Sequence, residues 1–364
     1  MPASQPLTSG ATPALLGRFQ TSTVLARVRE ILSVPRGQVS GRGLLLGAER
    51  GFKAVLVAGL APDRALWVTD DLESAYRIRQ DLKGLLPGHI IETFPGPDAL
   101  EGHILPLSWQ EIIHRVHTVM ALIGNSPIVV IVPLSGLFSW TLSPSRFRME
   151  CQTLVPGVER SLADLIKTLI RLGYQRVSNT QTRGEFSVRG GILDLFCPHE
   201  ASPVRLEFFG DEIDEIRIFD PVTQRSRDLK TRLELVPARE LILDEHELET
   251  IDPNQLSDDM GALLQSTLRD GAPKGSELLL DWLPQQRGLI EDHLGEKGLL
   301  IWDATPRAVS RASGLLNSAY PEGHVDSVLR VVERCQLLAF APSPRPVNPL
   351  PVIELGTEPV RVTR

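Results

Sequence analysis

Apolar and polar residues alternate with a period of two in four short segments between residues 185 and 219. In the first segment, Phe186 and Val188 fall on one side, and Ser187 and Arg189 fall on the other. Gly-Gly and Gly-Asp steps separate the segments, and glycine relaxes the backbone restrictions at a turn. The pattern predicts a small antiparallel meander with one packed face and one exposed polar face.

Strand and helix patterns alternate in the first third of the chain. Apolar segments at 65–69, 90–94 and 127–132 are separated by helical patterns at 71–86 and 109–123. Because a helix that follows a strand usually returns the chain to the same end of the sheet, this order predicts parallel strands.

Periodicity predicts three further elements. Residues 161–172 carry an apolar stripe at helical spacing, and Ser161 with Asp164 three residues later resembles a capping box. Residues 298–303 are typical of a buried strand, and residues 308–316 of a helix after it.

Arginines are unusually frequent just before and within the predicted meander. Arg171, Arg176, Arg183 and Arg189 recur in a stretch where Glu185 is the single acid, although the whole chain has a formal charge of −7. A solvated sheet face explains most surface charges. The pattern alone therefore leaves open whether these arginines bind a partner.

Four segments carry a resemblance to a known family: GYQRV at 173–177, TRGEFSVRGGILDLF at 182–196, VRLEFFGDEIDEIRIFD at 204–220 and TQRS at 223–226. They resemble the UvrB-homology region of the bacterial transcription-repair coupling factors, the Mfd family, and more distantly UvrB itself. The resemblance extends from about residue 41 to about residue 338.

The resemblance implies an α/β fold. A degenerate P-loop, helicase-like domain with a parallel sheet would carry an inserted, smaller α+β domain that binds UvrA. The implied division is a disordered tail at 1–23, domain 1a at 24–145, domain 2 at 146–236, domain 1b at 237–340, packing back on domain 1a, and a Pro-rich linker at 341–364.

The resemblance also implies a role and a binding surface. The expected function is non-catalytic recruitment of UvrA in transcription-coupled nucleotide excision repair of DNA damage. Arg176 and Arg189 fall on arginines of the UvrA-docking surface, and Arg183 is a third candidate. The spacing suggests that the three arginines share one face. Phe186 completes the candidate set, although its alternation with Val188 favours a place in the core.

A phosphate-binding loop is the motif that would make this chain an ATPase. Its pattern, G-x-x-x-x-G-K-[ST], corresponds here to residues 47–54, where Phe52 replaces the second glycine and Ala54 lacks the hydroxyl that holds magnesium. Lys53 is then best interpreted as a surface lysine. No acidic pair follows the predicted strand at 127–132. We expect a degenerate Walker A motif and no ATPase activity; the alternative is a nucleic-acid-binding, helicase-like module without an intact ATPase site.

Metal and nucleophile sites are not predicted. Cys151, Cys197 and Cys335 are widely separated and form no Cys-x-x-Cys pair. His114 and His117 lie at i and i+3 without a third ligand nearby in the sequence. The sequence therefore indicates no catalytic residue, metal or cofactor.

Composition favours a folded, cytoplasmic protein. Hydrophobic residues make up 42% and charged residues 23%, which is ordinary for globular domains. No apolar run is long enough to span a bilayer, and the first residues lack the pattern of a secretion signal, so we expect no membrane partner. In full-length relatives, the resemblance implies RNA polymerase and DNA as partners through regions outside these 364 residues.

Overall fold

The computed structural model describes residues 23–32, 42–46, 50–100, 103–295, 298–305, 307–310, 312, 336–341 and 352–354. The described chain forms two compact units: the first draws on 1–96, 124–138 and 294–364, and the second on 97–123 and 139–293. Most of the predicted tail, of the linker and of the helix at 308–316 lies outside the described residues, as do residues 47–49 and Cys335. The five-part division expected from the sequence stays a prediction.

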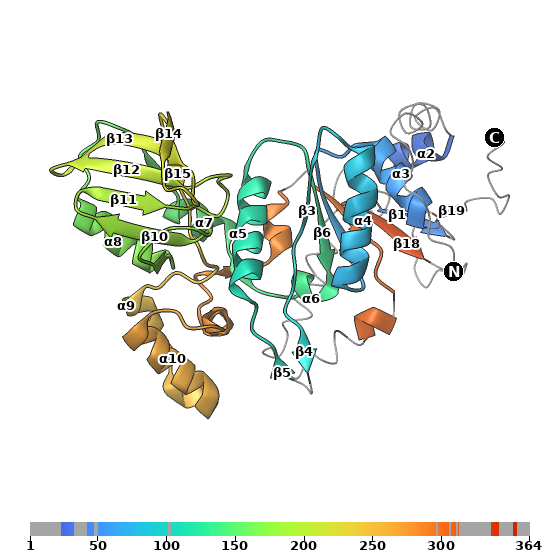
Figure 1. Ribbon diagram of the computed structural model, residues 1–364. Helices are drawn as coiled ribbons and strands as arrows, with labels where there is room; N and C mark the ends of the chain where they lie inside the picture. Colours follow the sequence, from blue (N-terminus) through green and yellow to red (C-terminus); the bar gives the residue numbers. More distant parts are fainter. Residues whose placement is uncertain are drawn as a thin grey trace. The chain divides into compact units, whose positions relative to one another are not determined.

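The first unit is built on a parallel sheet of seven described strands in the order β19-β1-β18-β17-β2-β6-β3 (Figure 1). Every strand pair in it is parallel. The strands are β1 (Arg42–Leu46), β2 (Arg64–Thr69), β3 (Ile90–Thr93), β6 (Ile128–Pro133), β17 (Leu299–Trp302), β18 (Gln336–Ala341) and β19 (Val352–Glu354). Its helices include α2 (Thr23–Leu32), α3 (Arg50–Leu60), α4 (Leu72–Leu85) and α6 (Leu134–Leu137).

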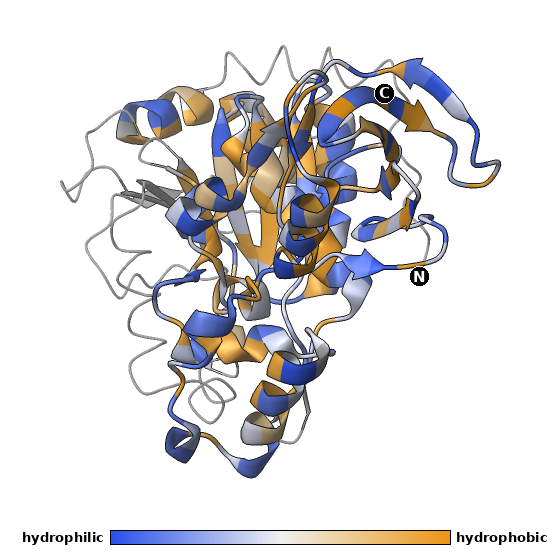
Figure 2. Cartoon of the chain, turned by 90° about the vertical axis from the view of Figure 1, so that its left-hand side faces the viewer, coloured by the Kyte–Doolittle hydropathy of each residue, from blue (hydrophilic) through white to orange (hydrophobic). Residues whose placement is uncertain are grey.

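The sheet forms because its strands are apolar on both faces. All six residues of β6 are buried, as are five of the six in β2, and such runs suit a parallel sheet covered on both sides. Helix α4 begins where the Asp71 side chain accepts a hydrogen bond from the Ser74 backbone N–H at 2.7 Å. The hydropathy colouring in Figure 2 shows the helices banded in blue and orange, the pattern of amphipathic elements. The predicted strands and the α/β class are confirmed.

The second unit contains a mainly antiparallel sheet of six described strands, in yellow and green in Figure 1, ordered β14-β13-β12-β11-β10-β9. Its strands are β9 (Gln175–Arg176), β10 (Glu185–Arg189), β11 (Ile192–Leu195), β12 (Val204–Phe209), β13 (Glu212–Phe219) and β14 (Ser226–Leu229). Strands β10 to β13 are the predicted meander, which is confirmed. A parallel edge strand, β9, and an antiparallel one, β14, widen it.

Helices and short strand pairs complete the second unit. The helices are α5 (Trp109–Ile123), α7 (Pro144–Glu150), α8 (Leu162–Arg171), α9 (Glu245–Leu248), α10 (Asp258–Asp270) and the 3-10 turns η2 (Pro253–Gln255), η3 (Ser276–Trp282) and η4 (Ile290–His293). The strand pairs are β4 (Ala99–Leu100) with β5 (His103–Ile104), β7 (Thr141–Leu142) with β16 (Arg287–Gly288), and β8 (Gln152–Leu154) with β15 (Leu233–Leu235). Across the described residues, every helix is too short or too polar to cross a membrane.

The capping box predicted at the start of α8 is wrong. Ser161 is the N-cap residue, but its side chain makes no capping hydrogen bond, and Asp164 instead lies 3.5 Å from Lys167 in an exposed ion pair. The helix therefore depends on its apolar stripe, in which Leu165 and Leu169 are fully buried.

Two glycines let other elements approach the meander closely. Gly184 has φ +84°, and a Cβ placed on it would lie 2.4 Å from the Trp109 ring and 2.6 Å from Ile113, both on α5. Gly173 has φ +81°, and its Cβ would meet the Arg239 side chain at 2.5 Å. Any larger residue at either position would have to displace its neighbour.

Gly184→Ala tests this close packing against Gly190→Ala. Both glycines have positive φ, so both changes cost about 1 kcal/mol of strain, but nothing lies within 4 Å of a Cβ on Gly190. We expect Gly184→Ala to lose about 2 kcal/mol more than Gly190→Ala in the free energy of unfolding, measured by urea denaturation. Equal losses in the two variants would contradict the packing against Trp109.

Candidate protein-docking surface

One face of the six-stranded sheet carries a row of polar side chains. The strand register aligns Ser187, Asp194, Arg205 and Arg217 across β10 to β13. Residues directly opposite one another point to the same side, so these four share what we call the polar face. The buried side of the same strands carries fully buried residues, among them Leu193, Leu206 and Ile216.

A buried carboxylate organises the polar face. Asp194 is 1% exposed, and it accepts hydrogen bonds from Arg205 Nε at 2.7 Å and Nη2 at 2.8 Å. The Arg205 guanidinium also lies over the Phe219 ring, 5.0 Å from its centroid. Because a two-pronged charged hydrogen bond fixes both partners, Arg205 is held in one orientation. Its pKa is raised by the hydrogen bond to Asp194.

Arg189 lies beside this pair and stays accessible. Its side chain is 52% exposed, and Nη2 donates to Asn179 Oδ1 at 2.9 Å and lies 3.8 Å from Asp194 Oδ2. A second acceptor, Gln224 Oε1, lies 3.4 Å from the same nitrogen. These neighbours hold the guanidinium in place while leaving about half of its surface open to solvent.

Arg176 does not share the polar face, contrary to the expectation from spacing. The parallel pairing of β9 with β10 places Arg176 opposite Phe186, whose ring lies on the buried side. Phe186 and Arg189 are three positions apart on one strand and so point to opposite sides. Arg176 is exposed on the edge strand, and among the described residues no hydrogen bond or ion pair involves its guanidinium.

Arg183 lies in the turn before β10, and its guanidinium is already engaged. Nε donates to the Glu200 carbonyl at 3.0 Å, and the group lies 5.5 Å from the centroid of the Phe196 ring. Its own carbonyl accepts a hydrogen bond from Trp109 Nε1 at 3.3 Å. Arg183 therefore contributes to local structure as well as to the charged surface.

Phe186 is fully buried, so its inclusion among candidate contact residues is corrected. The alternation with Val188 places the ring in the core of the sheet, where it cannot meet a partner directly. Sequence reasoning missed Asn179, Asp194, Arg205 and Gln224, which surround Arg189. The signal for the Asp194–Arg205 pair is an acidic residue on one strand directly opposite an arginine on the next. It can be recognised only when the register of the two strands is known.

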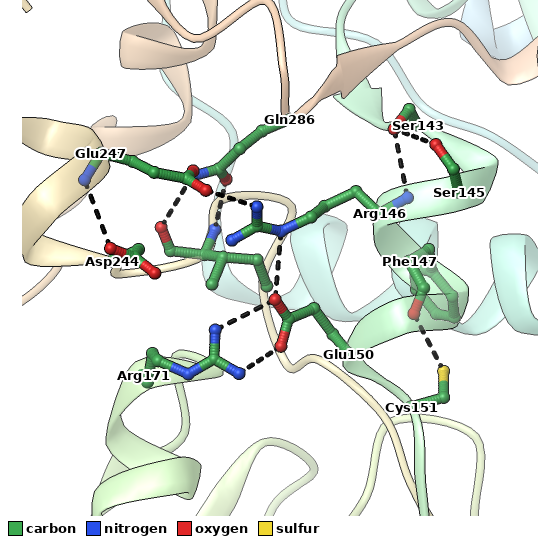
Figure 3. Close-up of polar contacts among 11 residues, drawn as sticks. Ser143, Ser145, Arg146, Phe147, Glu150, Cys151, Arg171, Asp244, Glu247 and Gln286 are labelled. Carbon is green, nitrogen blue, oxygen red and sulfur yellow. Dashed lines mark hydrogen bonds and ion pairs between the residues drawn. The ribbon is translucent and has the colours of Figure 1, made fainter. Parts of the chain in front are cut away.

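A set of charged and amide side chains, the base cluster, lies where the chain enters and leaves the meander: Arg146, Glu150, Arg171, Glu247 and Gln286 (Figure 3). Glu150 is nearly buried and lies between two guanidiniums, at 3.0 Å from Arg146 Nε and 3.0 Å from Arg171 Nη1. The hydrogen bonds that Arg171 donates to the Glu150 carboxylate raise the pKa of Arg171. The pair joins α7 to the last residue of α8.

The other half of the base cluster joins α7 to the segment after the meander. Arg146 Nη1 lies 2.5 Å from Glu247 Oε1 on α9, and Gln286 Nε2 donates to Glu247 Oε2 at 2.6 Å. Gln286 also accepts from the Ile242 backbone N–H at 2.9 Å. Segments before and after the meander are thus held by one partly buried network of ion pairs and hydrogen bonds.

The P-loop position of the first unit holds an internal ion pair. Lys53, on the first turn of α3, pairs with Asp303 just after β17, and its Nζ lies 5.1 Å from the centroid of the Phe340 ring. Trp67 Nε1 donates to the same carboxylate at 3.3 Å. Burial raises the pKa of Asp303, and Lys53 opposes this by favouring its charged form. The interpretation of Lys53 as a surface lysine is wrong, because its side chain is mostly buried.

The remaining candidates show no reactive arrangement. Burial raises the pKa of the Cys151 and Cys197 thiols to about 12, so both are protonated at neutral pH. The His114 and His117 rings stack with centroids 6.4 Å apart. Within the part of the chain that the structure describes, no group of three potential metal ligands comes together.

The part of the chain that contains the meander is similar to known proteins. Residues 153–241 match the UvrB interaction domain. The chain is 32% identical over 213 residues to the transcription-repair-coupling factor of Staphylococcus aureus (strain bovine RF122 / ET3-1). The aligned region covers 57% of this chain and 18% of that protein. The factor of Staphylococcus epidermidis (strain ATCC 35984 / RP62A) is 30% identical over 214 residues, 55% of this chain and 18% of that protein. The chain thus spans less than a fifth of the length of these relatives.

Glu150→Gln tests whether the base cluster stabilises the second unit. The change removes the charge between Arg146 and Arg171, and we expect a loss of about 2–3 kcal/mol in the free energy of unfolding. This loss in the free energy of unfolding should be smaller than the loss from breaking a fully buried ion pair, because the Arg171 side chain is one-third exposed to solvent. Lys167→Gln, which breaks the exposed pair with Asp164, should cost less than about 0.5 kcal/mol. Similar losses in the two variants would show that the cluster contributes little.

Proposed function

We propose that this chain is a non-catalytic recruitment module of transcription-coupled nucleotide excision repair, acting in the bacterial cytoplasm, and that it binds UvrA through the domain that matches the UvrB interaction domain. The match over residues 153–241 and the likeness to transcription-repair-coupling factors support the pathway. The observation that carries the binding surface is Arg189, exposed on the polar face and held there by its neighbours.

The chemistry of Arg189 suits an acidic partner surface. A guanidinium offers planar donors that pair with carboxylates in two-pronged fashion, and positioning it in advance reduces the entropy lost on binding. The Asp194–Arg205 pair beside it supplies a rigid support. Arg183, in the turn before β10, adds positive charge beside that strand, and Arg176 is exposed on the sheet's edge strand, off the polar face; we assign both supporting contacts.

An ATPase role receives no support from the P-loop position. Lys53 is paired with Asp303, while Phe52 and Ala54 replace the glycine and hydroxyl residue that nucleotide and magnesium need. We therefore assign ATP hydrolysis, and contacts with RNA polymerase and DNA, to regions of full-length relatives beyond the part that this chain matches.

Arg189→Ala tests the binding surface directly. We expect the affinity for purified UvrA, measured by isothermal titration calorimetry, to fall at least about tenfold, or ~1.4 kcal/mol. The affinity of Arg189→Lys for UvrA should lie between those of the parent chain and Arg189→Ala, because lysine keeps the positive charge but lacks the two-pronged donors of the guanidinium. Arg77→Ala is the matched control, since Arg77 on α4 is similarly exposed at 50%. UvrA binding unchanged in Arg189→Ala would contradict the assignment, and steeply salt-dependent DNA binding without UvrA binding would favour the nucleic-acid alternative.

Lys53→Met tests the internal ion pair. The change leaves the Asp303 carboxylate without its cation, and we expect a loss of about 1–3 kcal/mol in the free energy of unfolding. The exposed Lys83→Met should change this free energy by less than about 0.5 kcal/mol.

A thermal-shift measurement tests nucleotide binding at the same position. A ligand that binds the folded state raises the Tm, so we expect millimolar MgATP to leave the Tm of the parent chain unchanged. A rise that Lys53→Met abolishes would instead assign Lys53 to nucleotide binding.

A further inference from the structure

The hairpin tip between β12 and β13 exposes a large aromatic side chain on the polar face. Phe209 is 83% exposed. Among the exposed large apolar residues of the described chain, the other aromatic residue, Tyr76, is 48% exposed. The pairing of β12 with β13 shifts register between Glu207 and Phe208, and the extra residue, Asp214, lies on β13. Strand β12 itself keeps its alternation, so Phe209 points to the same side as Arg205 and Glu207. An exposed ring of this size forfeits the free energy that its burial would yield, which is a feature of sites that bind partners.

Like charges are placed opposite one another around this ring. The register pairs Glu207 with Glu215, and at the tip it pairs Phe209 with Glu212, which in turn forms a bridge with Glu159. Residues 207–215 contain five carboxylates and no lysine or arginine. Directly opposed like charges destabilise a sheet.

Only part of this repulsion is relieved within the described chain. Glu215 pairs with Arg217, whose Nη2 lies 2.6 Å from Glu215 Oε2. Among the described residues, no ion pair involves Glu159 or Glu212, and both are exposed. The Glu159–Glu212 pair beside Phe209 therefore leaves two carboxylates facing solvent without a cation.

The tip is firmly held, so the exposure of Phe209 does not come from a loose loop. The segment before α8 covers the free edge of β13: Gly157 N donates to Ile213 O at 2.7 Å, and Ile213 N donates to Val158 O at 3.2 Å. Arg160 N donates to Asp211 O at 2.5 Å. Three backbone hydrogen bonds fix the strand that carries Glu212.

We propose that this tip is the second half of the docking surface: Phe209 inserts into an apolar pocket of UvrA, and Glu159 and Glu212 receive lysine or arginine side chains at its rim. The inference rests on the proposed function. Aromatic anchors surrounded by polar groups are typical of binding hot spots. Arg189 then requires acidic groups on the partner and the tip requires basic ones, so the polar face accepts UvrA in one orientation.

Phe209→Ser and the double change Glu159→Gln/Glu212→Gln test the tip by calorimetry with UvrA. We expect Phe209→Ser to weaken binding about tenfold, with little dependence on salt, since burial of a ring is not screened. The glutamine pair should weaken binding about threefold to tenfold at low salt and less at high salt. Met149→Ser is the control, because Met149 is an exposed apolar residue on α7, outside residues 153–241.

The unbound variants give an independent measurement. If the carboxylates repel one another, Glu159→Gln/Glu212→Gln should raise the Tm of the free chain while weakening its binding, which a purely structural role would not do. Parent-like binding by both tip variants, with Arg189→Ala still weakened, would overturn the tip proposal and leave the proposed function standing. No binding of UvrA by the parent chain would overturn both.

Discussion

The ion pair between the buried Asp194 carboxylate and Arg205 is the constraint on which the candidate docking surface depends. A carboxylate inside a sheet is stable only if its charge is matched and its oxygens are hydrogen-bonded. Arg205 supplies both, and it can do so only in the observed register of β11 and β12. Slipping that register by one residue would send Arg205 to the buried face.

This register also decides what the polar face presents. With Arg205 beside Asp194, Arg189 lies at the same carboxylate and keeps half of its surface open. Phe209 follows Glu207 by two positions on β12, so it lies on the polar face at the hairpin tip. The base cluster holds the domain where the chain enters and leaves it, so the surface is carried on a stiff support. In the first unit, Lys53, which lies at the position of the P-loop lysine, is paired with Asp303.

Much of the fold follows from periodicity, because short-range patterns determine it. The helical pattern at 109–123 matches α5 at both ends, and the predicted meander strands match β10 to β13 closely. What could not be predicted depends on contacts between distant positions. The parallel pairing of β9 turns Arg176 away from Arg189, and Asp303, 250 residues from Lys53, makes that lysine part of the interior. The candidate arginines were found from the sequence, whereas the neighbours that orient Arg189 required the strand register.

The most direct test of the central claim is arginine footprinting. Modification by phenylglyoxal, followed by mass spectrometry, would compare Arg189 with Arg77, whose exposure is nearly the same, in the free chain and in its mixture with UvrA. Binding through the polar face predicts that UvrA slows modification of Arg189 severalfold and leaves Arg77 unchanged. Equal modification of Arg189 with and without saturating UvrA would contradict the account.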